Sequence, residues 1–190
     1  MSSIEEVITR VDTECRERRI PMLGQERSEL IAGLIAEHRP SLVVEVGTAI
    51  GYSGLWIANA LDEIGDGQLI TMDIDPDRSA EAGRNLDEAG LSHRVERQIG
   101  DARELCKSVK GPVDFLILDG GFDNYFPCFL ALKDSLASNA VIVADNVHIG
   151  EEEMKDYLDF VRAHYRCETR WFELDLEWSP KDAMEITWME

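Results

Sequence analysis

The sequence lacks long hydrophobic runs and is poor in basic residues, and these absences exclude several classes of partner. No stretch approaches the ~18 consecutive apolar residues of a membrane-spanning helix. The opening segment, MSSIEEVITRVDTECRERR, is too charged for a secretory signal peptide, so we expect a cytoplasmic protein with no membrane partner. Lys and Arg total 19 against 38 Asp and Glu, a formal net charge of -19. Such an acidic surface repels phosphate groups, which argues against nucleic acid and against a coenzyme A ester.

Paired cysteines are also missing. The four cysteines, Cys15, Cys106, Cys128 and Cys167, lie far apart and form no CxxC pair. This spacing argues against a zinc knuckle, and the chain is long for a disulfide scaffold. We therefore interpret these side chains as small buried hydrophobic groups.

The composition is that of a globular domain, with 44% hydrophobic and 30% charged residues. A length of 190 residues suffices for one sizeable core but is short for two. The sequence shows no internal repeat, low-complexity tract or linker-like segment. We therefore predict a single domain over residues 1–190.

Apolar runs of strand length alternate with segments of helical spacing along most of the chain. The predicted strands are residues 41–48, 67–75, 94–100, 113–120 and 140–146. Each connection is long enough for a parallel crossover, so the pattern predicts an α/β fold with a Rossmann-like, doubly wound, mostly parallel sheet. Strands 41–48, 113–120 and 140–146 are the most continuously apolar and should be central, whereas the polar strand 94–100 should lie near an edge.

Helices are predicted between these strands and before the first one. Apolar residues recur at helical spacing within residues 57–64, 82–89, 102–109, 125–132 and 154–161. Two N-terminal helices show the same spacing within residues 4–15 and 30–35. The tail differs, because residues 169–178 and 183–190 are aromatic and β-branched and flank the turn sequence SPKD. This pattern predicts a closing antiparallel hairpin.

In such a sheet, ligands bind beyond the carboxyl ends of the strands. The first predicted strand ends in EVGTAIGYSG, residues 45–54. Its glycines allow a tight turn close to a ligand, but the spacing G-x-x-x-G-x-x-G is not the dinucleotide fingerprint. The second strand ends in Asp73, which could accept the hydroxyls of a ribose in an NAD or S-adenosylmethionine site. We interpret Asp75 and Asp77 as helix-capping residues. Asp101, after the third strand, could hold an adenine edge or cap the next helix.

The fourth and fifth strands end in Asp119 and in the pair Asp145 and Asn146. These strand ends should lie near each other. Two carboxylates and an amide oxygen form a hard ligand set that suits Mg²⁺ or Ca²⁺. Helix capping by either aspartate is the alternative, and the three residues together favour a metal.

In this order and spacing, EVGTAIGYS, ITMDIDPD, GDA, LILDGGFDNY and VADN resemble the metal-dependent small O-methyltransferases, the group of catechol O-methyltransferase and the caffeoyl-CoA O-methyltransferase-like bacterial enzymes. The match runs from about Pro21 to the C-terminus, and VADN after LDxxxDNY is its most specific part. The resemblance implies S-adenosylmethionine as methyl donor and a divalent ion, Mg²⁺ or else Ca²⁺ or Mn²⁺. It also allows a homodimer, with the apolar face of the N-terminal helix as the contact.

The resemblance also implies roles for individual residues. The expected metal ligands are Asp119, Asp145 and Asn146. Glu185, in the closing hairpin, is the acid expected to touch a small acceptor. The expected cofactor-binding residues are Met22, Glu45, Gly47, Thr48, Gly51, Tyr52, Ser53, Asp73, Ile74, Asp101, Ala102 and Asp119.

One position departs from the family. Three residues after Asp119 the family usually carries a lysine that acts as general base, and this chain has Phe122. A base contributes ~10²–10⁴-fold to rate, so its loss slows such an enzyme without abolishing it. Phe122 could form an apolar wall of the acceptor site, or deprotonation could fall to another group, of which His148 is the nearest in sequence. VHIGEEEMKDYLDF after Asn146 leaves no long insertion over a bulky acceptor, so we expect a small, uncharged or cationic one.

Two alternatives belong to other functional classes. An NAD-dependent short-chain dehydrogenase is compatible with the glycine turn and Asp73, but no tyrosine here has a lysine four residues later. A non-catalytic S-adenosylmethionine-binding protein on the same fold is compatible with Phe122. The intact set of Asp119, Asp145 and Asn146 argues against it, because a binding protein has no need of that set.

Overall fold

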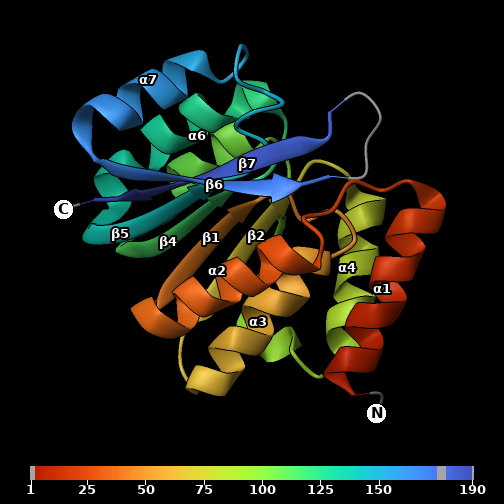
Figure 1. Ribbon diagram of the computed structural model, residues 1–190. Helices are drawn as coiled ribbons and strands as arrows, with labels where there is room; N and C mark the ends of the chain where they lie inside the picture. The colour runs from red at the N-terminus through yellow and green to blue at the C-terminus, as the bar shows by residue number, and fades with distance from the viewer. Residues whose placement is uncertain (1–2, 175–178, 190) are drawn as a thin grey trace.

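The computed structural model describes residues 3–174 and 179–189, in which seven strands form one sheet in the order β3-β2-β1-β4-β5-β7-β6 (Figure 1). β1 to β5 are parallel, and β7 pairs antiparallel with both β5 and β6. The strands are β1 (Leu42–Val46), β2 (Gln68–Asp73), β3 (Val95–Ile99), β4 (Val113–Leu118), β5 (Leu136–Ala144), β6 (Arg166–Glu173) and β7 (Lys181–Trp188). The predicted fold class is confirmed, with β1, β4 and β5 inside the sheet and β3 at its edge.

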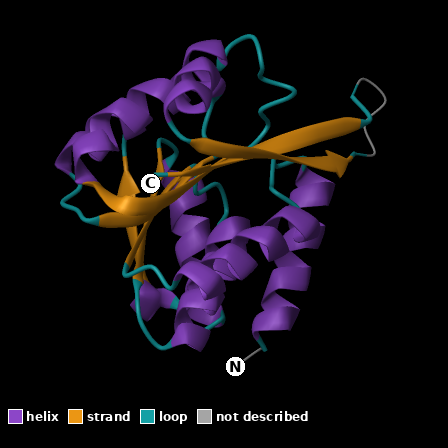
Figure 2. Ribbon diagram, turned by 60° about the vertical axis from the view of Figure 1, so that its left-hand side comes forward, coloured by secondary structure: helices purple, strands orange, loops and turns teal. Residues whose placement is uncertain are grey.

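Helices cover both faces of the sheet, which Figure 2 shows between two helical layers. α6 and α7 lie on one face, and α2 and α3 lie on the other, with α1 and α4 packed beside α3 (Figure 1). The helices are α1 (Ile4–Arg18), α2 (Gln25–His38), α3 (Tyr52–Ile64), α4 (Pro76–Glu88), α5 (Ala102–Leu105), α6 (Tyr125–Leu132) and α7 (Lys155–His164).

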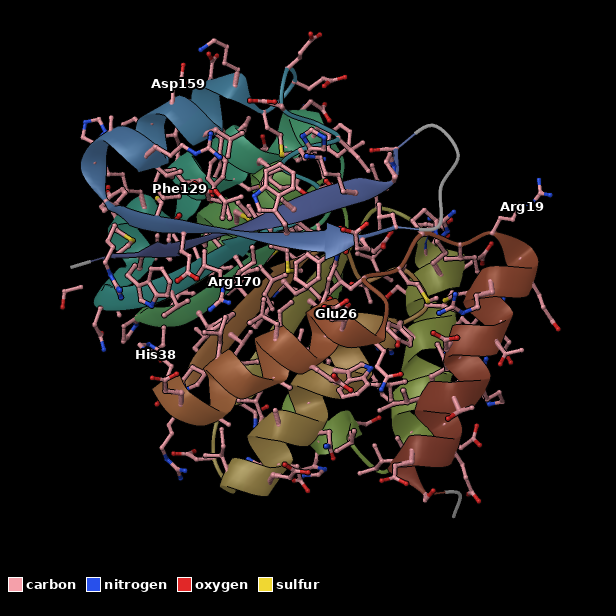
Figure 3. The ribbon with its side chains drawn as sticks, in the orientation of Figure 1. Arg19, Glu26, His38, Phe129, Asp159 and Arg170 are labelled. Atoms are coloured by element: carbon pink, nitrogen blue, oxygen red, sulfur yellow. The ribbon has the colours of Figure 1, made fainter. Side chains whose placement is uncertain are left out.

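The central strands are apolar on both faces because each face meets a helical layer. In β4, Phe115 and Ile117 pack with α2 and α3, whereas Leu116 and Leu118 pack with α6 and α7. In the latter layer Phe129 lies inside, between α6 and α7, while Asp159 lies on the outer side of α7 (Figure 3). Successive side chains of a strand therefore point to opposite helical layers. The same alternation sets the direction of the polar side chains at the strand ends.

The apolar face of α1 is buried within the chain. A capping box between Ser3 and Glu6 starts the helix. Val7, Val11 and Cys15 are then at most 1% exposed and pack with residues of α3 and α4. The expectation that this face forms a dimer contact is therefore wrong, because the face already has an intramolecular partner.

Two other expectations differ in detail from the structure. The helix predicted over residues 102–109 is a single α-helical turn, α5, followed by a 3₁₀ turn at Cys106–Ser108. The hairpin is present as β6 and β7, but residues 175–178 and 190 of its predicted span lie outside the described residues. Cys15, Cys106 and Cys128 are buried as expected, whereas Cys167 is half-buried. In the part of the chain that the structure describes, no helix is long and apolar enough to cross a membrane.

Candidate active site

A cavity of about 560 Å³ opens beyond the carboxyl ends of the parallel strands. It is lined by segments that follow each of β1 to β5 and by one residue that precedes α2. The lining residues are Pro21, residues 46, 47 and 49, residues 72–74 and 78, residues 100–103, residues 119–125, and Asn146. Of the expected cofactor residues, Gly47, Asp73, Ile74, Asp101, Ala102 and Asp119 are therefore in the lining.

The turn after β1 approaches the end of β4 so closely that it requires a glycine. Gly47 has a φ of 110°, and a Cβ at this position would lie 2.4 Å from the carbonyl oxygen of Asp119. The backbone N–H of Gly47 donates to the carbonyl oxygen of Met72, at 2.9 Å. This turn therefore presents bare backbone to the cavity, which is the cradle that a cofactor needs for close approach.

Glu45 lies beneath this turn and does not line the cavity. It is fully buried, and one carboxylate oxygen accepts a hydrogen bond from Thr71 Oγ1 at 2.5 Å. The Thr71 hydroxyl in turn lies 2.6 Å from that of Thr48. Burial raises the pKa of Glu45 to about 7, against the opposing effect of hydrogen bonds from Ser53 and Thr71. In this structure Glu45 supports the turn from below.

Five further expected cofactor residues also lie outside the cavity lining, and one of them is Thr48, which is 2% exposed. Gly51, Tyr52 and Ser53 begin α3, and Tyr52 and Ser53 are 4% and 7% exposed. Met22 packs against the apolar cluster of α1, α3 and α4, and its neighbour Pro21 lines the cavity instead. Their positions favour a supporting role over direct contact with a bound cofactor.

The carboxylate of Asp73 fixes the shape of the turn after β1. One oxygen accepts from the backbone N–H of Ala49 at 2.7 Å, and the other accepts from that of Asp75 at 2.8 Å. Ala49 has a φ of 43°, a conformation that L-residues rarely adopt. Asp75 caps α4 by accepting from the N–H groups of Asp77 and Arg78, as expected.

The cavity lining after β3 includes Arg103, which the sequence analysis did not identify. Asp101 caps α5 and also pairs with Arg103, whose Nη2 lies 2.6 Å from a carboxylate oxygen. This partner lowers the pKa of Asp101. Ile74 also lines the cavity, is 73% exposed and offers an apolar surface. A flat apolar edge and a guanidinium are both suited to contact with a purine ring.

The sheet register brings Asp119 and Asp145 side by side. Val46 pairs with Leu118, and Leu118 pairs with Ala144. The pattern continues one residue further, since Asp119 N–H donates to Val46 and Asp145 N–H donates to Leu118, at 2.9 and 3.0 Å. The expected approach of the fourth and fifth strand ends is therefore present.

The two aspartates differ in their partners. The Asp119 carboxylate lines the cavity and accepts no hydrogen bond from any described residue. Burial and the negative charges of Asp145 and Glu45 raise the pKa of Asp119 well above its ordinary value. Asp145 is 2% exposed, lies behind the lining, and accepts from Arg27 Nη1 with both oxygens at 2.7 Å. Burial raises the pKa of Asp145 to about 6, although Arg27 opposes the shift.

Asp182 of β7 joins the same cluster and is fully buried. Its Oδ2 accepts from Arg27 Nη2 at 3.0 Å and from Asn146 Nδ2 at 2.7 Å. Its Oδ1 accepts from the backbone N–H groups of His148 and Ile149 at 3.3 and 3.0 Å. Burial alone would raise the pKa of Asp182, but these hydrogen bonds and Arg27 together lower it. Asp182 therefore fixes the segment that follows β5.

The chemistry of the donor set fits a divalent ion at the cavity. The Asp119 carboxylate has no hydrogen-bond partner among the described residues, and the Asn146 amide donates through Nδ2 to Asp182, which leaves its oxygen available. Hard oxygen donors of this kind suit Mg²⁺. Asp145 is the third expected ligand, and both of its carboxylate oxygens accept from Arg27. Within residues 3–174 and 179–189, no group of three or more His, Cys, Asp or Glu side chains is arranged to hold a metal, and the expected set, with its asparagine, contains only two.

Phe122 lines the cavity directly beyond Asp119. Its ring also packs against the segment after β5, because a Cβ on Gly150 would lie 2.9 Å from it. Tyr125 follows at a ring-centroid distance of 6.4 Å, and its hydroxyl donates to the carbonyl oxygen of Asp145 at 3.0 Å. Phe122 is therefore a fixed apolar wall of the cavity.

Two expected site residues lie away from the cavity. The His148 ring packs edge-on against Trp171 of β6 at 5.0 Å and is not in the lining, so its position does not support a role as base. Glu185 is 1% exposed and pairs with Arg162 of α7 at 2.7 Å, on the face of β7 opposite Asp182. The expectation that Glu185 touches the acceptor is contradicted by this position.

Sequence analysis missed Asp182 and Arg27, and only Asp182 has a signal in the sequence that could have identified it. Strand alternation places Asp182 on the same face as Met184 and Ile186, toward α2, and Glu185 on the other face. This signal favours Asp182 over Glu185 near the cavity. Arg27, in the first turn of a helix before the sheet, gives no comparable signal.

Comparisons with known proteins identify the family of the chain. A family described as "Methyltransferase domain" matches residues 44–147. Catechol O-methyltransferase of Mus musculus is 32% identical over 92% of this chain and 67% of its own length, and that of Sus scrofa is 30% identical over 83% of this chain and 86% of its own. The chain thus spans about two thirds of the length of the mouse protein.

Solved structures share the fold. The O-methyltransferase TomG from Streptomyces achromogenes, in complex with SAM, superposes with a TM-score of 0.83 at 21% identity, covering 96% of this chain and 89% of that one. An O-methyltransferase from Bacillus cereus in complex with SAH gives 0.83 at 19% identity, covering 97% and 91%. The sequence matches favour methyl transfer over the dehydrogenase alternative. The chain belongs to the family of S-adenosylmethionine-dependent O-methyltransferases.

Proposed function

We propose that this protein transfers a methyl group from S-adenosylmethionine to a hydroxyl of a small, catechol-like acceptor, with the help of a divalent ion. The observation that carries the proposal is the Asp119 carboxylate, which accepts no hydrogen bond from residues 3–174 and 179–189. It faces the cavity between the cofactor turn at Gly47 and the wall formed by Phe122.

The residues around the cavity are suited to hold the cofactor at three points. Gly47 offers open backbone for the methionine end, and Asp73 lies at the end of β2, where it can accept from ribose hydroxyls. Asp101, Ala102 and Ile74 also line the cavity and are suited to contact the adenine. When bound, S-adenosylmethionine supplies an already activated methyl group, so orientation of the acceptor carries much of the rate.

Asp119, Asn146 and Asp145 would hold the ion. When bound, a divalent ion would lower the pKa of the acceptor hydroxyl. Asp119 anchors this site from β4, and Asp182 fixes Asn146 by accepting from its amide. The protein thereby sets the direction from which an acceptor can approach the cofactor turn.

Phe122 shapes the acceptor side of the site. Without a lysine, the site lacks the family's base, and deprotonation depends on the acidity of the acceptor itself. Packing against Gly150 and Tyr125 holds the phenyl ring in place. Phe122 is therefore suited to cover the apolar edge of an aromatic ring.

The acceptor that fits these features is small and carries no large negative charge. The formal net charge of -19 opposes binding of a polyanion. Only eight residues, 147–154, separate Asn146 from the start of α7, which leaves little chain to cover a bulky tail. A cytoplasmic location and a homodimer stay predictions.

The test is transfer of label from methyl-labelled S-adenosylmethionine to a simple catechol and, in parallel, to caffeoyl-coenzyme A. We expect faster transfer to the catechol. Faster transfer to the coenzyme A ester would overturn the acceptor class. Transfer to neither, with tight binding of S-adenosylhomocysteine in calorimetry, would instead favour the non-catalytic binding protein.

A further inference from the structure

The most unusual feature beside the cavity is a buried arginine between two buried acids. Arg27, Asp145 and Asp182 are 5%, 2% and 0% exposed. They come from α2, from the residue after β5, and from β7. Breaking such a buried pair by removing one partner is strongly destabilising, because a charge is left without compensation.

Local helix structure does not explain Arg27. It lies in the first turn of α2, whose N-cap residue Gly24 makes no side-chain capping bond. The macrodipole of a helix disfavours a cation at this end. The guanidinium is instead held by tertiary contacts, namely the two acids and the ring of Phe172, whose centroid is 5.1 Å from the guanidinium carbon. The position of Arg27 is therefore explained by its contacts with Asp145 and Asp182, whose negative charges it compensates.

We propose that Arg27 is an internal cation of the metal site. It balances Asp145 and Asp182 when no ion is bound, and it competes with a divalent ion for Asp145. This inference rests on the metal site of the proposed function, and it goes beyond that function by assigning a positioning residue outside the ligand set.

Two contacts define how this works. Both Asp145 oxygens are directed to Arg27 Nη1, so Asp145 is fixed while its charge is compensated. Through Nη2, Arg27 also holds Asp182, which accepts from the Asn146 amide. The ligand segment is therefore ordered before an ion binds. The same contact opposes ion binding. Asp145, one of the three expected ligands, is already paired with the positive charge of Arg27, so an ion would bind more weakly.

The test compares Arg27→Met, Arg27→Lys and wild type for thermal stability and for Mn²⁺ affinity by electron paramagnetic resonance. Arg27→Met leaves two buried acids uncompensated, so its Tm in EDTA should fall by about 10 °C. Its Mn²⁺ affinity should rise by about tenfold, since a competing charge is gone. Mg²⁺ should then raise its Tm by about twice as much as in wild type. Arg27→Lys keeps the charge, so its Mn²⁺ affinity should stay near that of wild type, and its Tm should fall by less than half as much as that of Arg27→Met, because one ammonium cannot replace both guanidinium contacts.

Arg162→Met is the matched control. It removes a guanidinium from buried Glu185, three residues along β7 from Asp182 and on the other face. Because the proposed metal site is intact in this variant, Mg²⁺ should raise its Tm only as much as it raises that of wild type. An Mg²⁺ shift of Arg27→Met equal to that of this control, or a weaker Mn²⁺ affinity, would overturn the inference.

A charge-restoring variant covers the case in which Arg27→Met does not fold in either buffer. Arg27→Met combined with Asp182→Asn removes one charge of each sign, so it should fold in EDTA, and its failure to fold would contradict the inference. If wild type binds no Mn²⁺, the metal part of the proposed function fails instead. The Tm loss of Arg27→Met and its rescue by Arg27→Lys then still test charge balance alone.

Discussion

Arg27 Nη1 lies 2.7 Å from both carboxylate oxygens of Asp145, a residue 118 positions later in the chain. A helix before the sheet is thereby tied to the end of its fifth strand. The contact lies directly behind the wall where Asp119 and Asn146 face the cavity. The same ion pair therefore fixes α2 against the sheet and supports the wall of the candidate site.

Replacing Phe122 by Lys should raise the rate of methyl transfer. The substitution restores a base at the position where the family carries one, and we expect about a 10–100-fold gain, at the lower end of what a general base contributes. The measurement is transfer of label to a simple catechol. Leu130→Lys, on the exposed side of α6, is the control and should leave the rate unchanged. A rate of Phe122→Lys no higher than wild type, with cofactor binding intact, would contradict the assigned role of this wall.

Asp73→Asn should weaken cofactor binding by about tenfold or more, since a charged acceptor for hydroxyl and amide donors is lost. The same change removes one of the acceptors that hold the Ala49 and Asp75 amides. Calorimetric titration with S-adenosylhomocysteine measures the effect. Asp77→Asn, in the exposed first turn of α4, serves as the control. Equal affinities of the two variants would show that Asp73 does not contact the ribose.

Gly47→Ala should destabilise the protein by about 3 kcal/mol, because the new methyl group meets the Asp119 carbonyl and φ is unfavourable. Gly90→Ala separates the two effects. Gly90 also has a positive φ, of 74°, but a Cβ there meets nothing within 4 Å, so strain alone should cost about 1 kcal/mol. Urea unfolding measures both. Equal losses would show that the approach of the two turns is looser than the structure indicates.

The free energy of unfolding should depend on pH through Glu45. Burial raises the pKa of Glu45 to about 7 in the folded protein, so the folded state binds a proton that the unfolded state has lost over the window between the two pKa values. Stability contributed by the protonated form is therefore full at low pH and is lost as pH rises toward about 7. Between about pH 5 and pH 8, wild type should lose about 2–3 kcal/mol more than Glu45→Gln. Parallel pH profiles of the two proteins would contradict this role of Glu45.

Much of the fold could be predicted from periodicity, because the central strands are covered on both faces and read as continuous apolar runs. The shortened α5 shows the limit of this approach. Ala102, Leu105, Cys106 and Val109 have helical spacing, but Val109 is extended, and Gly111 and Pro112 follow at once. Apolar spacing describes which side chains are buried, and a 3₁₀ turn can bury the same ones.

Sequence patterns placed residues at strand ends beside the cavity, and they missed residues whose position depends on tertiary contacts. Asp73, Asp119 and Asn146 follow strands directly, so the sheet itself places them at the cavity. Arg27 and Asp182 meet only because α2 and β7 pack against the end of β5. Such a contact depends on the whole arrangement of layers, which local sequence patterns do not encode.

The most direct test of the central claim is label transfer from methyl-labelled S-adenosylmethionine to a simple catechol, measured in Mg²⁺ and in EDTA, with Asp119→Asn beside wild type. We predict transfer in Mg²⁺, its loss in EDTA, and little transfer by Asp119→Asn in either buffer, while S-adenosylhomocysteine binds in all cases. Transfer that persists in EDTA and in Asp119→Asn would contradict a metal-assisted reaction at the end of β4.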